Sequence, residues 1–359
     1  MSIATQSALE TSVPQQEPVR ARRRLSRPAL VGLYLAGIAL GAALSAVTGF
    51  AVTSTVVYGV VLATLVVYVA TRAVEGRRKA ADRLVTCLVT TAFGIAMIPL
   101  VSLVYTVLEK GLARFDGTFF SNSMFRVVGE GGGAYHAILG TLVITALATL
   151  ISVPIGLMTA IYLVEYGSGR LKRAITFFVD VMTGIPSIVA GLFAFALFTL
   201  LFGNDVRMGV MGAVALSVLM IPVVVRSCEE VLKLVPNELR EASYALGVPK
   251  WRTVVKVVLP TAVAGLGTGV TLAVARVVGE TAPLLITVGL ITSTNLNPFG
   301  GRMATLPVFA YYQLTQPGTA TQAFLDRAWT AALVLIILVM ALNVVARLIS
   351  RFFAPKTGH

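Results

Sequence analysis

Charged and metal-binding residues are scarce in this sequence. Asp, Glu, Lys and Arg together make up 13% of the 359 residues, whereas about a quarter is usual in a soluble domain. The two cysteines, Cys87 and Cys228, lie in or beside apolar runs, and the two histidines, His136 and His359, are far apart. Their spacing indicates no disulfide framework and no metal site, and the two cysteines are interpreted as small packing residues.

Sequence motifs of enzymes are also missing. No GxxxxGK[ST] loop is present to cradle nucleotide phosphates, and neither HExxH nor GxSxG occurs. We therefore predict that the chain has no catalytic residues and binds no cofactor of its own. If its work consumes ATP, a partner protein must hydrolyse the nucleotide.

Hydrophobic residues, in contrast, make up 57% of the sequence, and the mean hydropathy is +0.86. A bilayer crossing needs about 20 apolar residues, and the apolar runs predict an all-α integral membrane protein with about eight transmembrane helices. Only Thr48–Phe50 separates the first two runs, which predicts a helical hairpin. The runs are Ala29–Val47, Ala51–Ala70, Leu84–Leu108, Ala134–Val164, Ala174–Phe202, Gly209–Val225, Thr261–Leu290 and Ala328–Ile349.

Basic residues are distributed unevenly between the predicted loops, and the net charge is +13. If the polar loop around residues 226–260 is cytoplasmic, the segments on its side hold 22 Lys and Arg, against 6 on the other side. Cytoplasmic loops of membrane proteins collect basic residues, so both termini are expected on the cytoplasmic side of the membrane. The same bias explains the net charge without nucleic acid. The outer loops 109–133 and 291–327 are either plain connections or a receptor surface.

The apolar runs and polar loops divide the chain into parts of different character. Several predicted spans contain proline, and bent helices of this kind can line a cavity. Gly265 and Gly269 form a GxxxG pattern, which predicts close helix packing. The predicted parts are a basic cytoplasmic tail 1–28, an extra transmembrane hairpin 29–70, a basic cytoplasmic linker 71–83, a transmembrane core 84–352 with a loop at 236–260, and a cytoplasmic tail 353–359.

The polar loop carries the most regular local pattern. Pro236 is placed to open a short helix, and Gly247 to end it in a left-handed cap. Small residues after Glu241 would let another protein surface approach closely. The alternative is an ordinary amphipathic loop at the membrane surface. The candidate coupling residues are Glu241, Ala242, Ser243, Gly247, Leu259 and Pro260.

Two charges lie inside the apolar run that follows this loop. Arg276 and Glu280 are four residues apart, so on one helix they share a face and can pair. Intramembrane charges are costly and usually face protein or water. By helix rise, Arg276 lies about 22 Å beyond Thr261, toward the outer side. Either the pair handles an anion or it fixes helix packing. Arg226, at the end of an apolar run, is a third candidate for an anion pathway, or else a snorkelling arginine.

The loop resembles the EAA loop of ABC importer permeases, EAA-x3-G-x9-I-x-LP, with Ser243 and Val257 as the two departures. The segment ARVVGETAPLL at Ala275–Leu285 is similar to the ARxxGETAPLL signature of the PstA-type permease of phosphate ABC importers. Further similar stretches are LMTAIYLVEYG, GIPSIVAGLFAF, VVVRSCEEVLKLVP, NPF and MATLP. The family core has six spans, and residues 1–70 depart from it.

This resemblance implies a transmembrane permease subunit of an ATP-driven phosphate importer in the bacterial plasma (inner) membrane. It implies that Arg226, Arg276 and Glu280 belong to the path of inorganic phosphate. The implied partners are a second, PstC-type permease, a cytoplasmic ATPase dimer that uses ATP-Mg, an extracytoplasmic phosphate-binding protein and membrane lipid. The alternatives are a permease for another oxyanion, such as sulfate or molybdate, and an ATP-independent secondary transporter. A further role in reporting phosphate supply to a sensor is also open.

Overall fold

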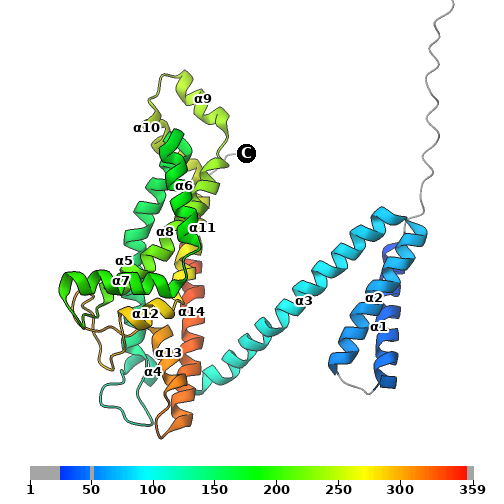
Figure 1. The fold of residues 1–359 in the computed structure, drawn as a ribbon, viewed down its shortest axis with the longest axis horizontal. Helices are drawn as coiled ribbons and strands as arrows, with labels where there is room; N and C mark the ends of the chain where they lie inside the picture. Colours follow the sequence, from blue (N-terminus) through cyan, green and yellow to red (C-terminus); the bar gives the residue numbers. More distant parts are fainter. Residues whose placement is uncertain (1–24, 49–51, 354–359) are drawn as a thin grey trace, which may run out of the picture. The chain divides into compact units, whose positions relative to one another are not determined.

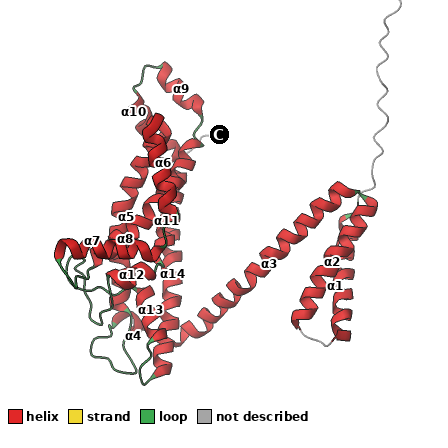
Figure 2. Cartoon of the chain, viewed as in Figure 1, coloured by secondary structure: helices red, strands yellow, loops and turns green. Residues whose placement is uncertain are grey.

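Helices make up all the regular structure of this protein in a computed structural model that describes residues 25–48 and 52–353 (Figure 1, Figure 2). No strand occurs within those ranges, and the predicted all-α fold is confirmed. Nearly all of the predicted tails 1–28 and 353–359 lies outside the described residues. The chain divides into two compact units, Met1–Leu103 and Val104–His359.

The first unit contains α1 (Arg27–Thr48), α2 (Val52–Val74) and the beginning of α3 (Arg77–Gly111). α1 and α2 pack closely against each other, and the predicted hairpin is confirmed. The contact is tight because small residues face one another: a Cβ on Gly41 would come within 2.3 Å of the backbone of Gly59. Tyr34 Oη on α1 hydrogen-bonds Cys87 Sγ on α3 at 2.9 Å.

The segment expected as a linker, 71–83, is helical except at Glu75 and Gly76. Glu75 is buried, and it accepts hydrogen bonds from the Leu25 backbone N–H at 2.6 Å and from Arg83 at 3.1 Å. The Leu25 N–H, followed by the charge of Arg83, lowers the pKa of the Glu75 carboxyl. A charged turn therefore joins α2 to α3.

The second unit is organised around α8. Of the most apolar 18 residues of α8, 61% are buried, against 6% for α3. The remaining elements are a 3-10 turn Leu112–Arg114, α4 (Gly117–Ser121), α5 (Tyr135–Ile161), a π-helical turn Tyr162–Tyr166, α6 (Gly169–Thr183), α7 (Ser187–Phe202), α8 (Gly209–Lys233), α9 (Asn237–Ala245), α10 (Lys250–Thr253), a π-helical turn Val254–Val258, α11 (Leu259–Val278), α12 (Ala282–Thr287), α13 (Leu306–Thr315) and α14 (Thr321–Phe353).

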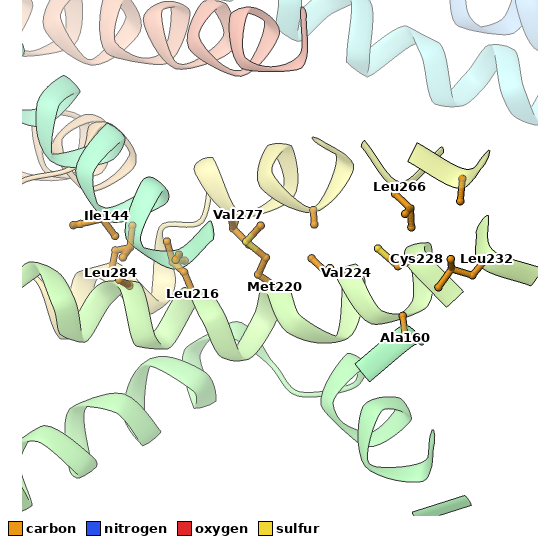
Figure 3. Packing of buried hydrophobic residues seen from close by; sticks show 14 of the residues in the cluster. Ile144, Ala160, Leu216, Met220, Val224, Cys228, Leu232, Leu266, Val277 and Leu284 are labelled. Carbon is orange, nitrogen blue, oxygen red and sulfur yellow. The ribbon is translucent and has the colours of Figure 1, made fainter. Parts of the chain in front are cut away.

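A stripe of apolar side chains on α8 forms the centre of the core, where it meets α5 and α11 (Figure 3). Leu216, Met220 and Val224 follow one another at helical spacing and are almost fully buried. The predicted close packing at the GxxxG pattern is confirmed. A Cβ on Gly265 would lie 2.6 Å from Val231, and one on Gly269 would lie 2.8 Å from Ser227, both on α8.

Two predicted spans are not continuous helices. Ala174–Phe202 is broken between α6 and α7, which are bent by 106°. Pro186 lacks an N–H donor and disfavours helix at the residue before it, so the helix stops there. Thr261–Leu290 is interrupted after Val278, where α11 ends. Hydropathy averaged over a window does not register such breaks. Among the described residues, seven helices are long and apolar enough to span a membrane, or eight if α6 and α7 count as one span.

Candidate functional site

The two helix breaks meet at a cavity of about 210 Å³. Arg276 and Glu280, from the end of α11 and the turn after it, line one side. Thr183 and Ser187, on either side of the α6–α7 break, line another, and Pro222 of α8 contributes to the remaining wall. The structure thus places two of the three predicted pathway residues in one polar cavity. The Ser187 hydroxyl there can donate a hydrogen bond, while that of Thr183 already donates to the carbonyl oxygen of Asp180 at 2.6 Å.

The expected ion pair between Arg276 and Glu280 is not formed. Four-residue spacing pairs side chains only along a continuous helix, but α11 ends at Val278. The N–H of Glu280 instead bonds the carbonyl oxygen of Val277 at 3.1 Å, in a tighter turn that moves its side chain off the expected face. Within the described residues, neither charge has an ion-pair or hydrogen-bond partner. Both are therefore available to a ligand or to water in the cavity.

Arg226 has a different environment from Arg276. Its guanidinium pairs with Asp180 of α6 and with Glu229 at 2.8 Å. Glu229 in turn binds Lys233 at 2.7 Å. Arg226 does not line the cavity of Arg276 and Glu280. Its charge is already balanced by carboxylates, so in this conformation Arg226 is not a free anion ligand.

The cluster around Arg226 nevertheless adjoins the cavity. Asp180 lies one helical turn before Thr183 on α6, and Arg226 lies one turn after Val223 on α8, and both Thr183 and Val223 line the cavity. An ion pair between α6 and α8 therefore lies next to the cavity, on the side toward the polar loop. Sequence reasoning missed Asp180, because a pairing over 46 residues leaves no local signal.

The polar loop folds as two short helices joined by a left-handed turn. Gly247 has φ +73°, and the N–H of Val248 bonds Ser243 O at 3.2 Å while that of Gly247 bonds Tyr244 O at 2.9 Å. This is a Schellman motif, and the predicted glycine cap is confirmed. α9 begins at Asn237, with Pro236 as its N-cap rather than inside its first turn.

Ser243 was expected to lie on a surface that another protein can approach closely, but it does not. Its side chain is buried, and its hydroxyl bonds Thr253 of α10 at 2.9 Å. The hydroxyl therefore holds the two short helices together. Glu241 and Ala242 are exposed, as is Pro260, the second residue of α11, while Leu259 is half-buried.

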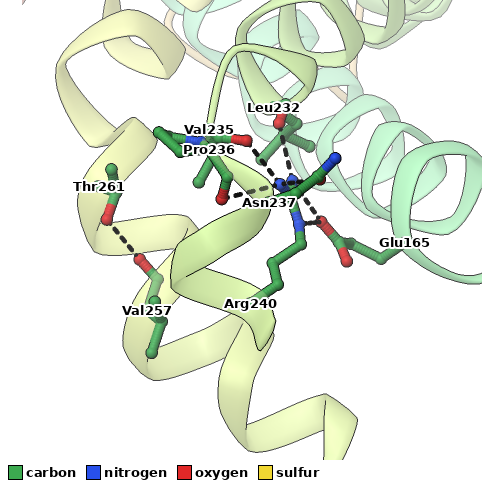
Figure 4. A network of polar contacts seen from close by, with 8 residues as sticks. All are labelled: Glu165, Leu232, Val235, Pro236, Asn237, Arg240, Val257 and Thr261. Carbon is green, nitrogen blue, oxygen red and sulfur yellow. Dashed lines mark hydrogen bonds and ion pairs between the residues drawn. The ribbon is translucent and has the colours of Figure 1, made fainter. Parts of the chain in front are cut away.

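One arginine fixes α9 to the end of the helical core (Figure 4). Arg240 donates to Glu165 Oε1 at 3.0 and 2.9 Å. It also donates to the carbonyl oxygens of Val235 at 2.6 Å and Leu232 at 3.0 Å. The side chains are 12% and 4% exposed, so this is a buried ion pair between α9 and the π-helical turn after α5, in which two guanidinium nitrogens donate to one carboxylate oxygen. Neither residue was predicted, because 75 positions separate them.

Large apolar side chains lie exposed on this same loop. Leu246, beside the glycine turn, is 82% exposed and Trp251 is 58% exposed. Two exposed apolar side chains on one polar loop give it a candidate contact surface. The loop is thus firmly attached to the core on one side and offers apolar groups on the other.

At the opposite end of the second unit from α9 and α10 (Figure 1), a buried arginine orders a loop. Arg327 is 0% exposed. It donates to the carbonyl oxygens of Gly129 at 2.8 Å and Gly131 at 2.9 Å, and to Gln313 at 3.1 Å. The loop that contains Gly129 and Gly131 is therefore held in place, and its composition alone gave no sign of Arg327.

Comparison with known proteins gives concordant matches. Residues 152–359 match the family model of the binding-protein-dependent transport system inner membrane component. The chain is 50% identical over 283 residues to the phosphate transport system permease protein PstA 1 of Mycobacterium tuberculosis (strain CDC 1551 / Oshkosh), covering 78% of this chain and 91% of that one. It is 48% identical to PstA of Mycobacterium leprae, covering 76% and 89%, and 36% identical to PstA of Pasteurella multocida, covering 78% and 97%.

A solved structure shares the fold. It is a bacterial ABC transporter involved in the import of the acidic polysaccharide alginate, matched with a TM-score of 0.54 at 13% identity over 77% of this chain and 97% of that one. At this identity the match bears on the fold alone. It agrees with the arrangement of helices described above.

Proposed function

The chain belongs to the binding-protein-dependent inner membrane permeases, with the PstA proteins as its relatives, and we propose that it is a permease subunit of an ATP-driven phosphate importer. Nearly the whole length of relatives named phosphate transport system permeases is covered. Those relatives do not favour sulfate or molybdate as the cargo. The chain itself is not an enzyme, since ATP hydrolysis in such importers lies with a separate subunit.

The cavity at the helix breaks is the proposed phosphate site of this subunit. Arg276 supplies a guanidinium whose planar fork matches two oxygens of an oxyanion. Ser187 supplies a hydroxyl donor nearby, whereas the Thr183 hydroxyl already donates to the carbonyl oxygen of Asp180 at 2.6 Å. Glu280 supplies a carboxylate that accepts a hydrogen bond from a protonated phosphate oxygen, since phosphate retains a proton at neutral pH. The unpaired state of both charges is the observation that carries this proposal.

The cluster around Arg226 is the proposed gate on the cytoplasmic side. Asp180 and Glu229 hold the guanidinium while the cavity is closed. Movement of α6 away from α8 separates Asp180 from Arg226 and leaves a positive charge for the departing anion. In this scheme Arg226 contacts the anion only after α6 has moved away from α8.

The polar loop is the proposed contact with the ATPase. Its exposed face carries Glu241 and Ala242, with Leu246 at the glycine turn. The Arg240–Glu165 pair transmits displacement of α9 to the ends of α5 and α8. In this scheme the loop lies in the cytoplasm, both termini lie there too, and a second permease subunit completes the pathway. A phosphate-binding protein delivers the anion to the outer loops.

Uptake of ³²P-phosphate into vesicles containing the complete importer tests the cavity. Arg276→Gln is expected to abolish uptake while the complex still assembles. Arg170→Gln, which removes an exposed charge at the start of α6, is the matched control and should keep normal uptake. Normal uptake by the Arg276 variant would refute the assignment.

Co-purification with the ATPase tests the loop. Gly247→Asp places a charge at the turn and should release the ATPase. Gly169→Asp is the control, because Gly169 also has positive φ, at +65°, and open space around it. Both variants carry the same backbone strain and charge. Release by both, or by neither, would show that the turn is not the contact.

A further inference from the structure

Two arginines converge at a glycine on the outer side of the second unit. Gly289 follows α12 and has φ +69°. The Cδ atoms of Arg207 and Arg302 each lie 3.4 Å from the point where a Cβ on Gly289 would stand. The two side chains come from different loops, one before α8 and the other before α13. Glycine at this position leaves room for both.

Hydrogen bonds fix the loop that carries Arg302. The Asn295 side-chain amide donates to the carbonyl oxygens of Gly300 at 2.8 Å and Arg302 at 2.9 Å. The backbone N–H of Met303 bonds Val288 O at 3.4 Å, which closes the loop across Gly289. The arginine backbone is thus held in place without any contribution from its own charge.

Arg207 is held from the other side. Its guanidinium lies over the ring of Phe195 of α7, 5.9 Å from the centroid. One nitrogen makes a long hydrogen bond, 3.4 Å, to the carbonyl oxygen of Leu285 on α12. Most of its five donors therefore remain unused. The contact with α12 places Arg207 beside the helix that follows Glu280.

The charges of this pair are not neutralised within the described residues. Neither arginine forms an ion pair there, and Asp205, the nearest carboxylate in sequence to Arg207, is exposed and unpaired as well. The apolar stems of both arginines meet at Gly289, so the two cations are anchored close to each other, and a bound anion relieves their repulsion. Two guanidinium groups together offer the forked donor geometry that oxyanions prefer.

The position of the pair relates it to the cavity of Arg276 and Glu280. Arg207 comes just before α8, whereas the polar loop comes just after α8. The two arginines therefore lie at the end of this 25-residue helix that is opposite the polar loop. α12, of six residues, leads from the Glu280 turn to Gly289 and spans about 9 Å. The pair is therefore one short helix farther out than the cavity.

We propose that Arg207 and Arg302 form a second anion-binding site, which receives inorganic phosphate on the outer side before it reaches Arg276. This proposal rests on the proposed function and deepens it, because it adds a station to the same pathway. Within the described residues, no carboxylate contacts either arginine, so no group in the site accepts a hydrogen bond from a protonated phosphate oxygen. The site therefore binds oxyanions by charge and discriminates poorly between phosphate and sulfate. Selection is left to the inner cavity, where Glu280 lies.

A local fluorescence reporter tests this site in the purified, complete importer. Phe299, three residues before Arg302, is 67% exposed and accepts a cysteine-linked dye as Phe299→Cys. The native Cys87 and Cys228 are buried and free of disulfides. Titration with inorganic phosphate, and separately with sulfate, should change the fluorescence in a saturable way. Added neutral salt should weaken both responses, since exposed charges are screened.

Arg207→Gln and Arg302→Gln should each raise the half-maximal phosphate concentration about tenfold, as expected from losing one charge-assisted contact. Arg126→Gln is the matched control, because Arg126 is another outer-loop arginine and lies over Phe125 instead. It should leave the titration unchanged, and so should Arg276→Gln. Unchanged titration in both single variants, or an equal loss in the Arg126 variant, would overturn the site.

Two further measurements distinguish anion binding at this pair from protein docking and from a failure of transport. If both arginine variants bind phosphate normally but lose affinity for the phosphate-binding protein, the pair is a protein-docking contact and the proposal is wrong. The proposed function fails in a different way, through absent phosphate uptake by wild-type vesicles. A saturable response of the Phe299→Cys reporter in the purified importer would support the outer site even then.

Discussion

Removal of Arg240 should detach α9 from the ends of α5 and α8. The arginine makes two hydrogen bonds to Glu165 and two short ones to the carbonyl oxygens of Val235 and Leu232. In Arg240→Met, the apolar stem is largely retained, but the carboxylate of Glu165 is left buried without its partner. Its side chain is 4% exposed, so water compensates little.

The size of the effect follows from this burial. Removing one partner of a buried ion pair costs about 3–5 kcal/mol, and each 1.36 kcal/mol is a tenfold change in an equilibrium constant. The Ser243–Thr253 hydrogen bond ties α9 to α10 rather than to the core, and it is worth only about 1 kcal/mol. Opening of α9 should therefore become roughly two to four orders of magnitude more frequent.

Hydrogen exchange of the α9 amides in the purified importer measures this opening directly. Under the proposed coupling of this loop to the ATPase, phosphate uptake per ATP hydrolysed, measured on the same sample, should fall because α9 is no longer tied to α5 and α8. Arg252→Met is the matched control, since Arg252 lies over Trp251 on the same loop but forms no ion pair within the described residues.

The double variant Glu165→Gln with Arg240→Met provides the sharpest test. A buried carboxylate without its cation is the main cost, so removing its charge should restore part of the lost protection. If α9 exchanges at the wild-type rate in Arg240→Met, or if the double variant is worse than the sum of the singles, the anchoring role of the pair is refuted.

Three other changes have definite expected outcomes. Arg327→Leu leaves the half-buried carbonyls of Gly129 and Gly131 without a side-chain donor, and each lost hydrogen bond is worth about 1 kcal/mol. Limited proteolysis should therefore cut the loop before α5 faster, and an unchanged rate would contradict this. Asp180→Asn should lower stability by less than about 1 kcal/mol in thermal unfolding, because Asp180 is 57% exposed; a loss of several kcal/mol would disprove a surface pairing. The Leu25 N–H and Arg83 lower the pKa of Glu75, so the ionised carboxylate stabilises the folded protein above the unfolded-state pKa of about 4.3. This stabilisation is lost as the pH falls through the lower folded-state pKa. The acid sensitivity of thermal unfolding should therefore be smaller in Glu75→Gln than in the wild type, and equal sensitivity would argue against this role of Glu75.

The sequence alone determined the features that depend on neighbouring residues. Long apolar runs predicted the membrane helices, because a bilayer crossing requires a continuous apolar stretch. The left-handed turn at Gly247 was predictable, because a helix cap is formed by residues within one turn of it. The close approach of Gly265 and Gly269 to another helix followed from their small size and spacing.

Only the tertiary structure decided which charges meet. Arg240 and Glu165 are 75 residues apart, and Arg226 and Asp180 are 46 apart, so no local pattern links them. The expected Arg276–Glu280 pair failed because α11 ends between the two residues, and the helix break that separates them also opens the cavity they line. The packing of helices that are distant in sequence determines which groups a buried charge meets. Neighbouring residues, in contrast, determine the hydropathy of a segment and the cap that ends a helix.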